Sequence, residues 1–279
     1  MGHEEILITK ANGEKEPFDP VKLQFSLRKA KASDELIKKI VDHILGEIEA
    51  GTTTSHIYKH AFDLLHQLEK PIALRYSLRR AIMELGPSGF PFEHLIGELL
   101  KAQGYSVLND QMVKGQCAEH EIDIVGYNDK KLIMIEAKYH NSLGLQSDLK
   151  VALYVKARVD DLKPVEFHYG HARHLDESWL VTNTKFTTSA IKYAECQDIK
   201  MIGWNYPING SLQDMIEAAE LHPLTCLTSL PQQAKKHLLE KGIVLCKSVP
   251  MHINLLKEVG MNDHQIKQAI DEINLLYTV

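Results

Sequence analysis

The sequence predicts a multidomain α/β protein in which a β-hairpin with helices is followed by a mixed-sheet α/β core and a small helical domain. Three observations support this division. A hairpin signal and helical patterns occupy the first 85 residues, strands and helices alternate between about 92 and 204, and short helices alone follow from about 220. Alternating strands and helices are typical of an α/β sheet, whereas helices alone indicate a bundle. We therefore place the domains at residues 1–86, 87–218 and 219–279.

The first part opens with a predicted β-hairpin. Residues 6–19 form two short strands around Asn12-Gly13, a dipeptide that favours the tight turn of a hairpin. Asp19 can cap a helix that has Pro20 at its first position, where proline is favoured. The partly apolar face of this helix is expected to comprise Val21, Phe25, Leu27 and Ala30. Further helices are predicted over residues 34–49, from Thr54-Ser55 onward and over residues 71–85.

A short linker separates the first two parts. Residues 85–91, Leu-Gly-Pro-Ser-Gly-Phe-Pro, contain two prolines and two glycines. These residues end one helix, delay the next and leave the segment semi-rigid. A stiff joint of this kind can transmit a rearrangement from the first domain to the second.

The second part contains a β-hairpin with polar residues where apolar ones would be expected. Its arms are residues 121–127 and 132–138, joined by a turn-forming Asn-Asp-Lys. Period-two geometry places Glu136 and Lys138 on one face, and Asp123 can approach them from the other arm, at about 5 Å between Cβ atoms. Two buried acids and a base are costly unless they pair or bind a cation, and converging carboxylates suit magnesium. Alternatively, an exposed hairpin carries these residues by chance.

A short amphipathic helix is predicted before this hairpin. Its apolar residues at helical spacing are Phe92, Leu95, Ile96 and Leu99. Gly104 is a suitable C-terminal stop. Glu93 lies one turn before Gly97, where a missing side chain lets a sheet approach, so Glu93 is expected to point at the acidic cluster while Glu98 stays solvated. The alternative role for Glu93 is that of a first-turn acid favoured by the helix dipole.

Strands and helices continue to alternate downstream. Residues 178–181 form a predicted buried strand, a capped amphipathic helix follows to about 195, and residues 199–204 form another strand. With the helix led by Phe92-Glu93, the acidic hairpin, the Glu136-Ala-Lys138 strand and the run LVTNTKFTTSAIKYAE, the chain resembles the Mrr-like branch of restriction endonucleases, in the PD-(D/E)xK superfamily. The resemblance covers roughly residues 88 to 218. Residues 119–123 depart from it, because the family often has a glycine-rich approach to the aspartate.

This resemblance implies a set of catalytic roles. Asp123 and Glu136 would hold one or two Mg²⁺ ions, with Mn²⁺ as a substitute, and the carbonyl of Ala137 would add a ligand. Glu93 would help through a bound water. Lys138 would orient or deprotonate the attacking water and stabilise charge on the phosphate. Its alternative role is a structural salt bridge with Glu136 or Asp123.

The first domain resembles the ATP-cone, a small regulatory nucleotide-binding domain. The residues that carry this resemblance are ILITKANGEKEPFDPVKLQFSLRKA and GTTTSHIYKHAFDLL. It implies that Lys10 and Lys22 meet nucleotide phosphates and that Ile8 and Thr54 line the nucleotide pocket. Ala11 stands where the family often has arginine. Lysines at a strand end and a helix start can neutralise a triphosphate. No GxxxxGK[ST] or GxGxxG motif occurs, which disfavours a P-loop or Rossmann site.

The last part is predicted to be helical. Three or four short helices are punctuated by Gly242, Pro250 and Gly260, and the last two resemble a helix-hairpin-helix arrangement of the kind that holds a nucleic-acid backbone. A bundle that packs on the nuclease or forms a dimer is an equal alternative.

The composition is that of a globular protein, with 44% hydrophobic and 25% charged residues. No apolar run approaches a membrane span, so we expect a cytoplasmic protein without membrane contact. The cysteines, Cys117, Cys196, Cys226 and Cys246, lack zinc-finger or disulfide spacing and are expected to be core thiols. A net charge of −5 argues against broad adhesion to DNA but allows a local basic groove. Candidates for phosphate contact are Lys130, Lys131, Lys150, Lys156 and Arg158.

Together these features predict a Mg²⁺-dependent endodeoxyribonuclease of the restriction, defence or repair type. ATP or dATP is expected to bind the first domain as a regulator that is not consumed, and a homodimer or higher homo-oligomer is expected. One alternative is a nucleotide-sensing DNA-binding regulator with a silent nuclease-like domain. Another is a structural partner in a larger assembly. Intact Asp123, Glu136 and Lys138 argue against a silent domain, because a retired active site need not keep all three residue types.

Overall fold

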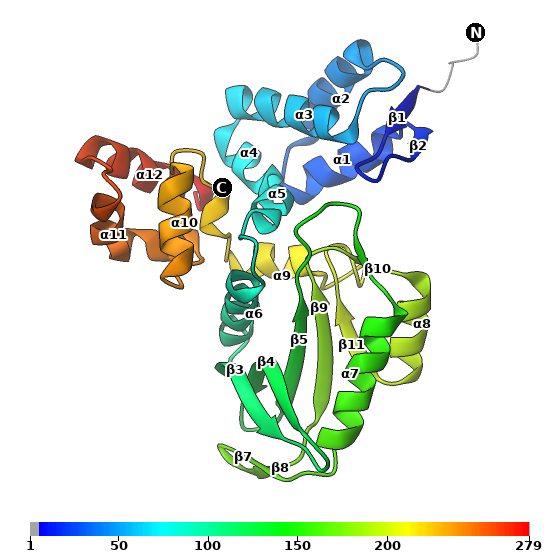
Figure 1. The fold of residues 1–279 in the computed structure, drawn as a ribbon. Coiled ribbons are helices and arrows are strands. Elements are labelled where there is room, and N and C mark those ends of the chain that lie inside the picture. The colour runs from blue at the N-terminus through cyan, green and yellow to red at the C-terminus, as the bar shows by residue number, and fades with distance from the viewer. Residues whose placement is uncertain (1–5, 279) are drawn as a thin grey trace.

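The computed structural model describes residues 6–278 and begins with the predicted hairpin (Figure 1). Strands β1 (Leu7–Thr9) and β2 (Lys15–Pro17) are antiparallel, and Gly13 takes a positive φ of 85° in the turn. Asp19 caps the next helix by accepting a hydrogen bond from the Val21 N–H at 2.9 Å. The helices that follow are α1 (Pro20–Lys29), α2 (Asp34–Glu47), α3 (Thr54–Leu68), α4 (Lys70–Tyr76) and α5 (Leu78–Met83).

Two details of this first part differ from the prediction. Leu23 and Leu27 form the buried stripe of α1, whereas Val21 and Phe25 are 64% and 51% exposed. The predicted apolar face is therefore divided, with Leu27 and Ala30 buried and Val21 and Phe25 exposed, because apolar residues at helical spacing form two stripes and only packing selects one of them. The predicted helix over residues 71–85 is divided between α4 and α5 at Ser77, whose hydroxyl donates to the Leu74 carbonyl at 2.7 Å.

The second part is built on a five-stranded mixed sheet with the order β11-β9-β5-β4-β3. β3, β4 and β5 are antiparallel neighbours, whereas β5, β9 and β11 are parallel. This agrees with the predicted mixed-sheet α/β core. The strands are β3 (Ser106–Lys114), β4 (Glu119–Tyr127), β5 (Leu132–Lys138), β9 (Glu177–Thr182) and β11 (Ile199–Ile202). Two short strand pairs flank the sheet: β6 (Gln146–Ser147) with β10 (Lys185–Phe186), and β7 (Phe167–Tyr169) with β8 (His171–Arg173).

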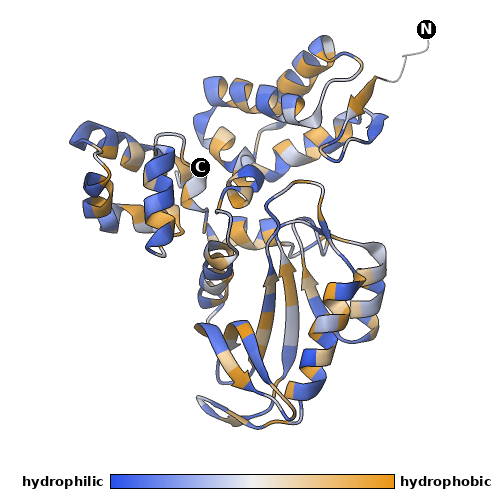
Figure 2. Ribbon diagram, in the orientation of Figure 1, coloured by the Kyte–Doolittle hydropathy of each residue, from blue (hydrophilic) through white to orange (hydrophobic). Residues whose placement is uncertain are grey.

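Helices cover both faces of this sheet (Figure 1). α6 (Phe90–Ala102) packs on one face, and α7 (Leu149–Leu162) and α8 (Thr188–Cys196) pack on the other. The first four residues of β5, residues 132–135, therefore alternate between two apolar surroundings, which explains why the strand opens with an unbroken apolar run (Figure 2). Gly97 allows the predicted close approach, because a Cβ atom there would lie 3.3 Å from Val107 Cγ1.

α6 begins at Phe90, inside the predicted linker, because Pro91 falls in its first turn where proline is tolerated. Leu85 and Phe92, on either side of Gly86, are both fully buried in the same apolar core. The connection between the first and second parts is therefore packed against the rest of the protein as well as short.

The C-terminal part is helical, as predicted. After α9 (Leu212–Ala219), which ends the second part, its elements are η1 (Leu224–Cys226), α10 (Gln232–Glu240), η2 (Cys246–His252), α11 (Ile253–Glu258) and α12 (Asp263–Leu276). It packs on α4 and α5, where Arg75 donates to the Leu276 carbonyl at 3.1 Å and Thr225 donates to the Ala81 carbonyl at 2.7 Å. One apolar core joins these helices to α5 and α6, so the third part is not a separate lobe.

Two of the four cysteines contradict the prediction of core thiols. Cys226 and Cys246 are buried, but Cys117 and Cys196 are exposed, because they lie in a turn and at a helix end. No helix within residues 6–278 is both long and apolar enough to cross a membrane.

Candidate active site

The predicted acidic hairpin is present, and its two carboxylates face each other. Ile124 pairs with Ile135, so Asp123 and Glu136 occupy the next opposed positions along β4 and β5. One oxygen of Asp123 accepts a hydrogen bond from the Ala137 N–H at 2.6 Å. The turn length sets this register, and the register in turn sets which side chains meet.

A pocket of about 430 Å³ opens at this point of the sheet. All of the residues to which catalytic or metal-binding roles were assigned line it: Glu93, Asp123, Glu136, Ala137 and Lys138. Glu93 reaches the pocket from the first turn of α6, whereas Glu98 pairs with Lys101 at 2.7 Å on the outer face. The structure thus brings the predicted residues together, while their chemical roles stay predictions.

Two carboxylates of the pocket, Asp123 and Glu93, have raised pKa values. Burial, followed by the negative charge of Glu136, raises the pKa of Asp123 to about 6 from its ordinary 3.8. Burial, followed by the charges of Asp123 and Asp110, raises the pKa of Glu93 to about 7. Because these shifts come from desolvation and like-charge repulsion, a cation placed among the carboxylates would reverse them.

Arg158 supplies a close positive charge to Glu136. Its guanidinium reaches Glu136 from α7 at 2.6 Å, with side chains that are only 10% and 17% exposed. Arg158 also donates to the Tyr154 hydroxyl at 2.6 Å. The prediction that Arg158 contacts DNA phosphate disagrees with these contacts, because both ends of its guanidinium are engaged inside the protein.

Lys138 is exposed at the end of β5 and lines the pocket. Over residues 6–278, no acidic group lies within ion-pair distance of its ammonium. The alternative role for Lys138, a structural salt bridge with Glu136 or Asp123, is therefore wrong for this structure. Two of the other lysines considered for DNA are paired, Lys131 with Glu177 and Lys156 with Asp160.

The sequence analysis missed one acid that interacts with a residue of this pocket. Asp110 on β3 falls opposite Asp123, between the pairs Asn109–Ile124 and Gln111–Ile122. It forms a hydrogen bond with Glu93 that contributes to the raised pKa of Glu93. Leu108, Asp110 and Met112 lie at every second position of β3 and share one face, so the sequence could have placed an acid on that face. Nothing local indicated that β3 pairs with β4 in this register.

The predicted nucleotide-binding residues also lie near one another. Lys10 and Lys22 both pair with Glu16, at 2.9 and 3.2 Å, and they line a cavity of about 370 Å³ with Thr54. Ile8 is buried and lines an adjoining cavity of about 620 Å³, which shares Lys22 and Thr54 with the first. These residues therefore line two adjoining cavities, while their binding of a nucleotide stays a prediction.

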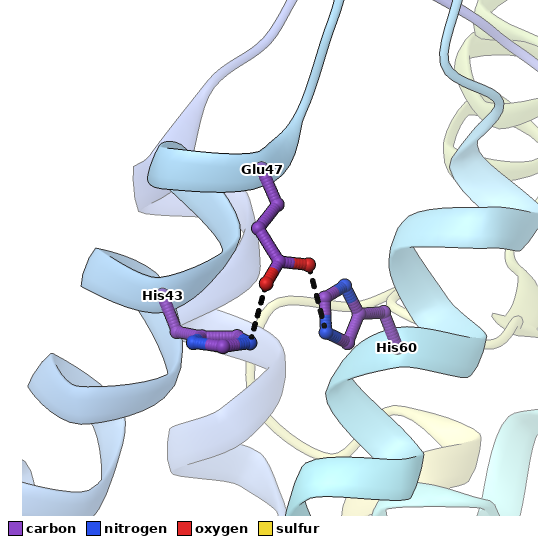
Figure 3. Close-up of side chains that lie close together, drawn as sticks. All are labelled: His43, Glu47 and His60. Atoms are coloured by element: carbon purple, nitrogen blue, oxygen red, sulfur yellow. Dashed lines mark ion pairs between the residues drawn. The ribbon is translucent and has the colours of Figure 1, made fainter.

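One further group of potential metal ligands lies away from the carboxylate pocket. His43 and Glu47 of α2 point toward His60 of α3, and Glu47 forms ion pairs with the two imidazoles at 3.1 and 3.4 Å (Figure 3). One ligand atom from each residue lies within 4.8 Å of the others. Imidazole nitrogens suit zinc, whereas the carboxylates around Asp123 suit magnesium. The two groups therefore differ in the ion that each prefers.

Comparison with known proteins identifies two of the three parts. A family described as restriction endonuclease matches residues 86–205, and a family described as AF1548-like, C-terminal, matches residues 222–277. Neither match reaches residues 1–85. An uncharacterized protein of Archaeoglobus fulgidus is 33% identical over 178 residues, which are 63% of this chain and 97% of that protein.

Solved structures give the same picture. The crystal structure of AF1548, a protein of unknown function, is 31% identical with a TM-score of 0.55 and covers 67% of this chain and 97% of its own. Can2 from Sulfobacillus thermosulfidooxidans, solved with cyclic tetra-adenylate, covers 68% of this chain and 60% of its own. Its TM-score of 0.32 and identity of 13% are too low to carry an argument. The chain belongs to the AF1548-like family, with a restriction endonuclease domain at residues 86–205 and an AF1548-like C-terminal domain at residues 222–277.

Proposed function

We propose that this protein is a metal-dependent endonuclease that hydrolyses phosphodiester bonds in DNA and is regulated by ATP or dATP. The observation that carries the proposal is the single pocket lined by Glu93, Asp123, Glu136 and Lys138, within a restriction endonuclease domain. Opposed carboxylates beside a lysine are the groups that such hydrolysis requires.

The donor set of the pocket fits a hard divalent cation. Asp123 uses one oxygen for the Ala137 N–H and keeps the other for a ligand, and Glu136 adds a second carboxylate. The Ala137 carbonyl is a candidate third ligand, and Glu93 would act through a water. Mg²⁺ or Mn²⁺ bound there would supply the positive charge that the scissile phosphate and its attacking water need.

The protein's own residues account for the remaining requirements. Lys138 has no acidic partner among residues 6–278, so its ammonium would be able to orient the attacking water and to stabilise charge on the phosphate. Glu93, with a pKa raised to about 7, can hold or release a proton near neutral pH. Arg158 partly neutralises Glu136 before a cation binds, which limits repulsion between Glu136 and Asp123.

Regulation by a nucleotide is supported by the cavity that Lys10, Lys22 and Thr54 share. Lysine ammonium groups attract a triphosphate, and Glu16, which now pairs with both lysines, would lose these contacts to the ligand. ATP or dATP would bind here as a regulator that is not consumed, and DNA hydrolysis would take place in the separate carboxylate pocket.

A second candidate function is a nucleotide-sensing DNA-binding regulator with a silent nuclease domain. The ion pair between Arg158 and Glu136 favours it, because a guanidinium already occupies one of the carboxylates that a cation needs. In an active enzyme, Arg158 must yield part of this contact when the cation binds.

Cleavage of plasmid DNA tests the two functions. The wild type is assayed with Mg²⁺, with and without ATP, beside Lys138→Ala and a matched control, Lys192→Ala. Lys192 is an exposed lysine of α8 that is not paired in the described structure. We expect Mg²⁺-dependent cleavage that Lys138→Ala reduces by at least about a hundredfold and Lys192→Ala leaves unchanged. DNA binding without cleavage by the wild type would favour the regulator.

A further inference from the structure

One loop of the nuclease domain borders both the carboxylate pocket and the nucleotide cavity. This connecting loop, residues 139–145, joins the end of β5 at Lys138 to β6. Its first residues, Tyr139, His140 and Asn141, line the carboxylate pocket. Its last residues, Leu143, Gly144 and Leu145, line the cavity that contains Lys10 and Lys22. The two pockets therefore share a wall.

The far end of the connecting loop touches the first domain directly. A Cβ atom on Gly144 would lie 3.4 Å from Asn12 Cβ, so the backbone of the loop packs against the turn of the β1–β2 hairpin. Asn12 stands between Lys10, which lines the cavity, and Glu14, whose N–H donates to the Asn12 side chain at 3.2 Å. A ligand that moves this hairpin must also move the loop.

The cavity carries more positive charge than Lys10 and Lys22 alone provide. Arg79 of α5 and Lys185 of β10 line it together with Lys10 and Lys22, while the acids are Glu14 and Glu16. Burial, followed by repulsion from Arg79, Lys10 and Lys22, lowers the pKa of Lys185. The Arg79 Nε atom is buried and has no hydrogen-bond partner in the described structure. Convergent cations with an unused donor indicate a polyanionic ligand.

The adjoining cavity has a different character. It shares Lys22, Arg79 and Lys185 with the first cavity and extends over apolar and aromatic side chains. These include Val21, Phe25, Tyr76 and Trp204. The exposed stripe of α1 therefore faces a cleft between the two domains, where apolar surface next to a polyanion site suits a purine base and its phosphates.

We propose that the cleft between the first domain and the nuclease domain binds a nucleoside polyphosphate, with Arg79 and Lys185 as phosphate ligands, and that the connecting loop transmits its occupancy to the carboxylate pocket. This inference rests on the proposed nucleotide regulation and assigns half of the site to residues outside the ATP-cone-like pattern. Residues of two domains then bind one ligand, so ligand binding and the arrangement of the domains are thermodynamically linked.

A hydrogen-bonded route leads from Lys185 to Lys138. Lys185 pairs through its backbone with Gln146, at the end of the connecting loop. Two residues earlier, Asn183 accepts from the His140 N–H at 2.8 Å and donates to the His140 carbonyl at 2.7 Å. Thr182 donates to the Lys138 carbonyl at 2.8 Å. A phosphate that draws Lys185 toward itself therefore acts on the segment that holds the end of β5.

Calorimetric titration with ATP and with inorganic tripolyphosphate tests the binding half of the proposal. We expect Lys185→Ala to weaken both ligands by about tenfold to a hundredfold, the effect of losing one charge-assisted contact, and Lys192→Ala to bind as the wild type does. Equal weakening of ATP and tripolyphosphate shows that Lys185 meets phosphate. Wild-type affinity for tripolyphosphate in Lys185→Ala would overturn this role.

Lys10→Ala separates the failure of this inference from the failure of the proposed regulation. Weakened binding in Lys10→Ala with unchanged binding in Lys185→Ala would confine the ligand to the first domain and overturn the shared site. An absence of ATP and tripolyphosphate binding by the wild type would overturn nucleotide regulation itself, and with it this inference.

Hydrogen exchange measured by mass spectrometry tests transmission without relying on activity. We expect ATP to slow amide exchange in residues 139–145 of the wild type and to leave this segment unchanged in Lys10→Ala at the same ATP concentration. Unchanged exchange over residues 139–145 in a wild-type protein saturated with ATP would overturn the role of the connecting loop.

Discussion

Replacing Asp123 by asparagine is expected to stabilise the metal-free protein at pH 8, although Asp123 is central to the proposed activity. Asp123 is held beside Glu136 with a pKa of about 6 in place of 3.8. Its folded-state pKa is raised, so its contribution to stability is fully present below pH 3.8 and is lost as the pH rises through about 6. An asparagine oxygen can still accept the hydrogen bond from the Ala137 N–H.

The size of the effect follows from the shift in pKa. A shift of about two units corresponds to roughly 3 kcal/mol when Asp123 is fully ionised. Because the side chain is partly exposed and solvent screens its charge, roughly 1–2 kcal/mol is the realistic gain for Asp123→Asn. This gain should be near zero at pH 4, grow between pH 4 and about 6 and stay constant above pH 7, where the wild-type carboxylate is ionised.

Urea unfolding followed by tryptophan fluorescence measures this gain. Trp179 and Trp204 are buried in the nuclease core and report on the domain that holds Asp123. At pH 8 without metal, Asp123→Asn should raise the unfolding midpoint by roughly 0.5–1 M urea. An equal or lower midpoint for Asp123→Asn at pH 8, or a gain that does not depend on pH, would refute the reasoning.

Adding Mg²⁺ should reverse the order of the two proteins. A cation at one hundred times its dissociation constant stabilises the wild type by about 2.7 kcal/mol, whereas Asp123→Asn lacks the ligand and should gain little. The titration is repeated in a His60→Ala background, so that an ion held by His43, Glu47 and His60 is not counted. Equal stabilisation of both proteins would place the cation outside the carboxylate pocket.

Three further predictions concern the same sites. Glu136→Gln should abolish cleavage yet keep a hydrogen bond to Arg158. Glu136→Ala should also lower the free energy of unfolding, by up to roughly 3–5 kcal/mol, because it leaves the buried guanidinium of Arg158 without its counter-charge. Nuclease assays and urea unfolding of both variants check this. Lys10→Ala or Lys22→Ala should weaken ATP binding by roughly 1.5–3 kcal/mol, and unchanged calorimetric affinity in both would place the site elsewhere. Because the pKa of Glu93 is raised to about 7, Mg²⁺ affinity should increase with pH up to about 7, and Glu93→Gln should flatten this dependence in calorimetry.

The local sequence determined the elements whose geometry depends on near neighbours. Asn12-Gly13 set the first turn, Asp19-Pro20 began α1, and the short connection between β4 and β5 set Asp123 against Glu136. In each case the interacting groups lie within a few residues of one another or are joined by one tight turn, so the chain has few alternatives. The resemblance to restriction endonucleases depended on the last of these elements, together with the helix led by Phe92-Glu93 and the run LVTNTKFTTSAIKYAE, and is confirmed by the family match over residues 86–205.

Only the tertiary structure decided what surrounds these elements. It placed Arg158 on Glu136 and Asp110 beside Glu93, across separations along the chain that no local pattern encodes. It also buried Leu23 and Leu27, whereas the other apolar stripe of α1 stays exposed and lines the cleft between domains. Helical spacing shows that an apolar stripe exists, but the surface that it meets depends on how distant elements pack, because burial is a property of the whole fold.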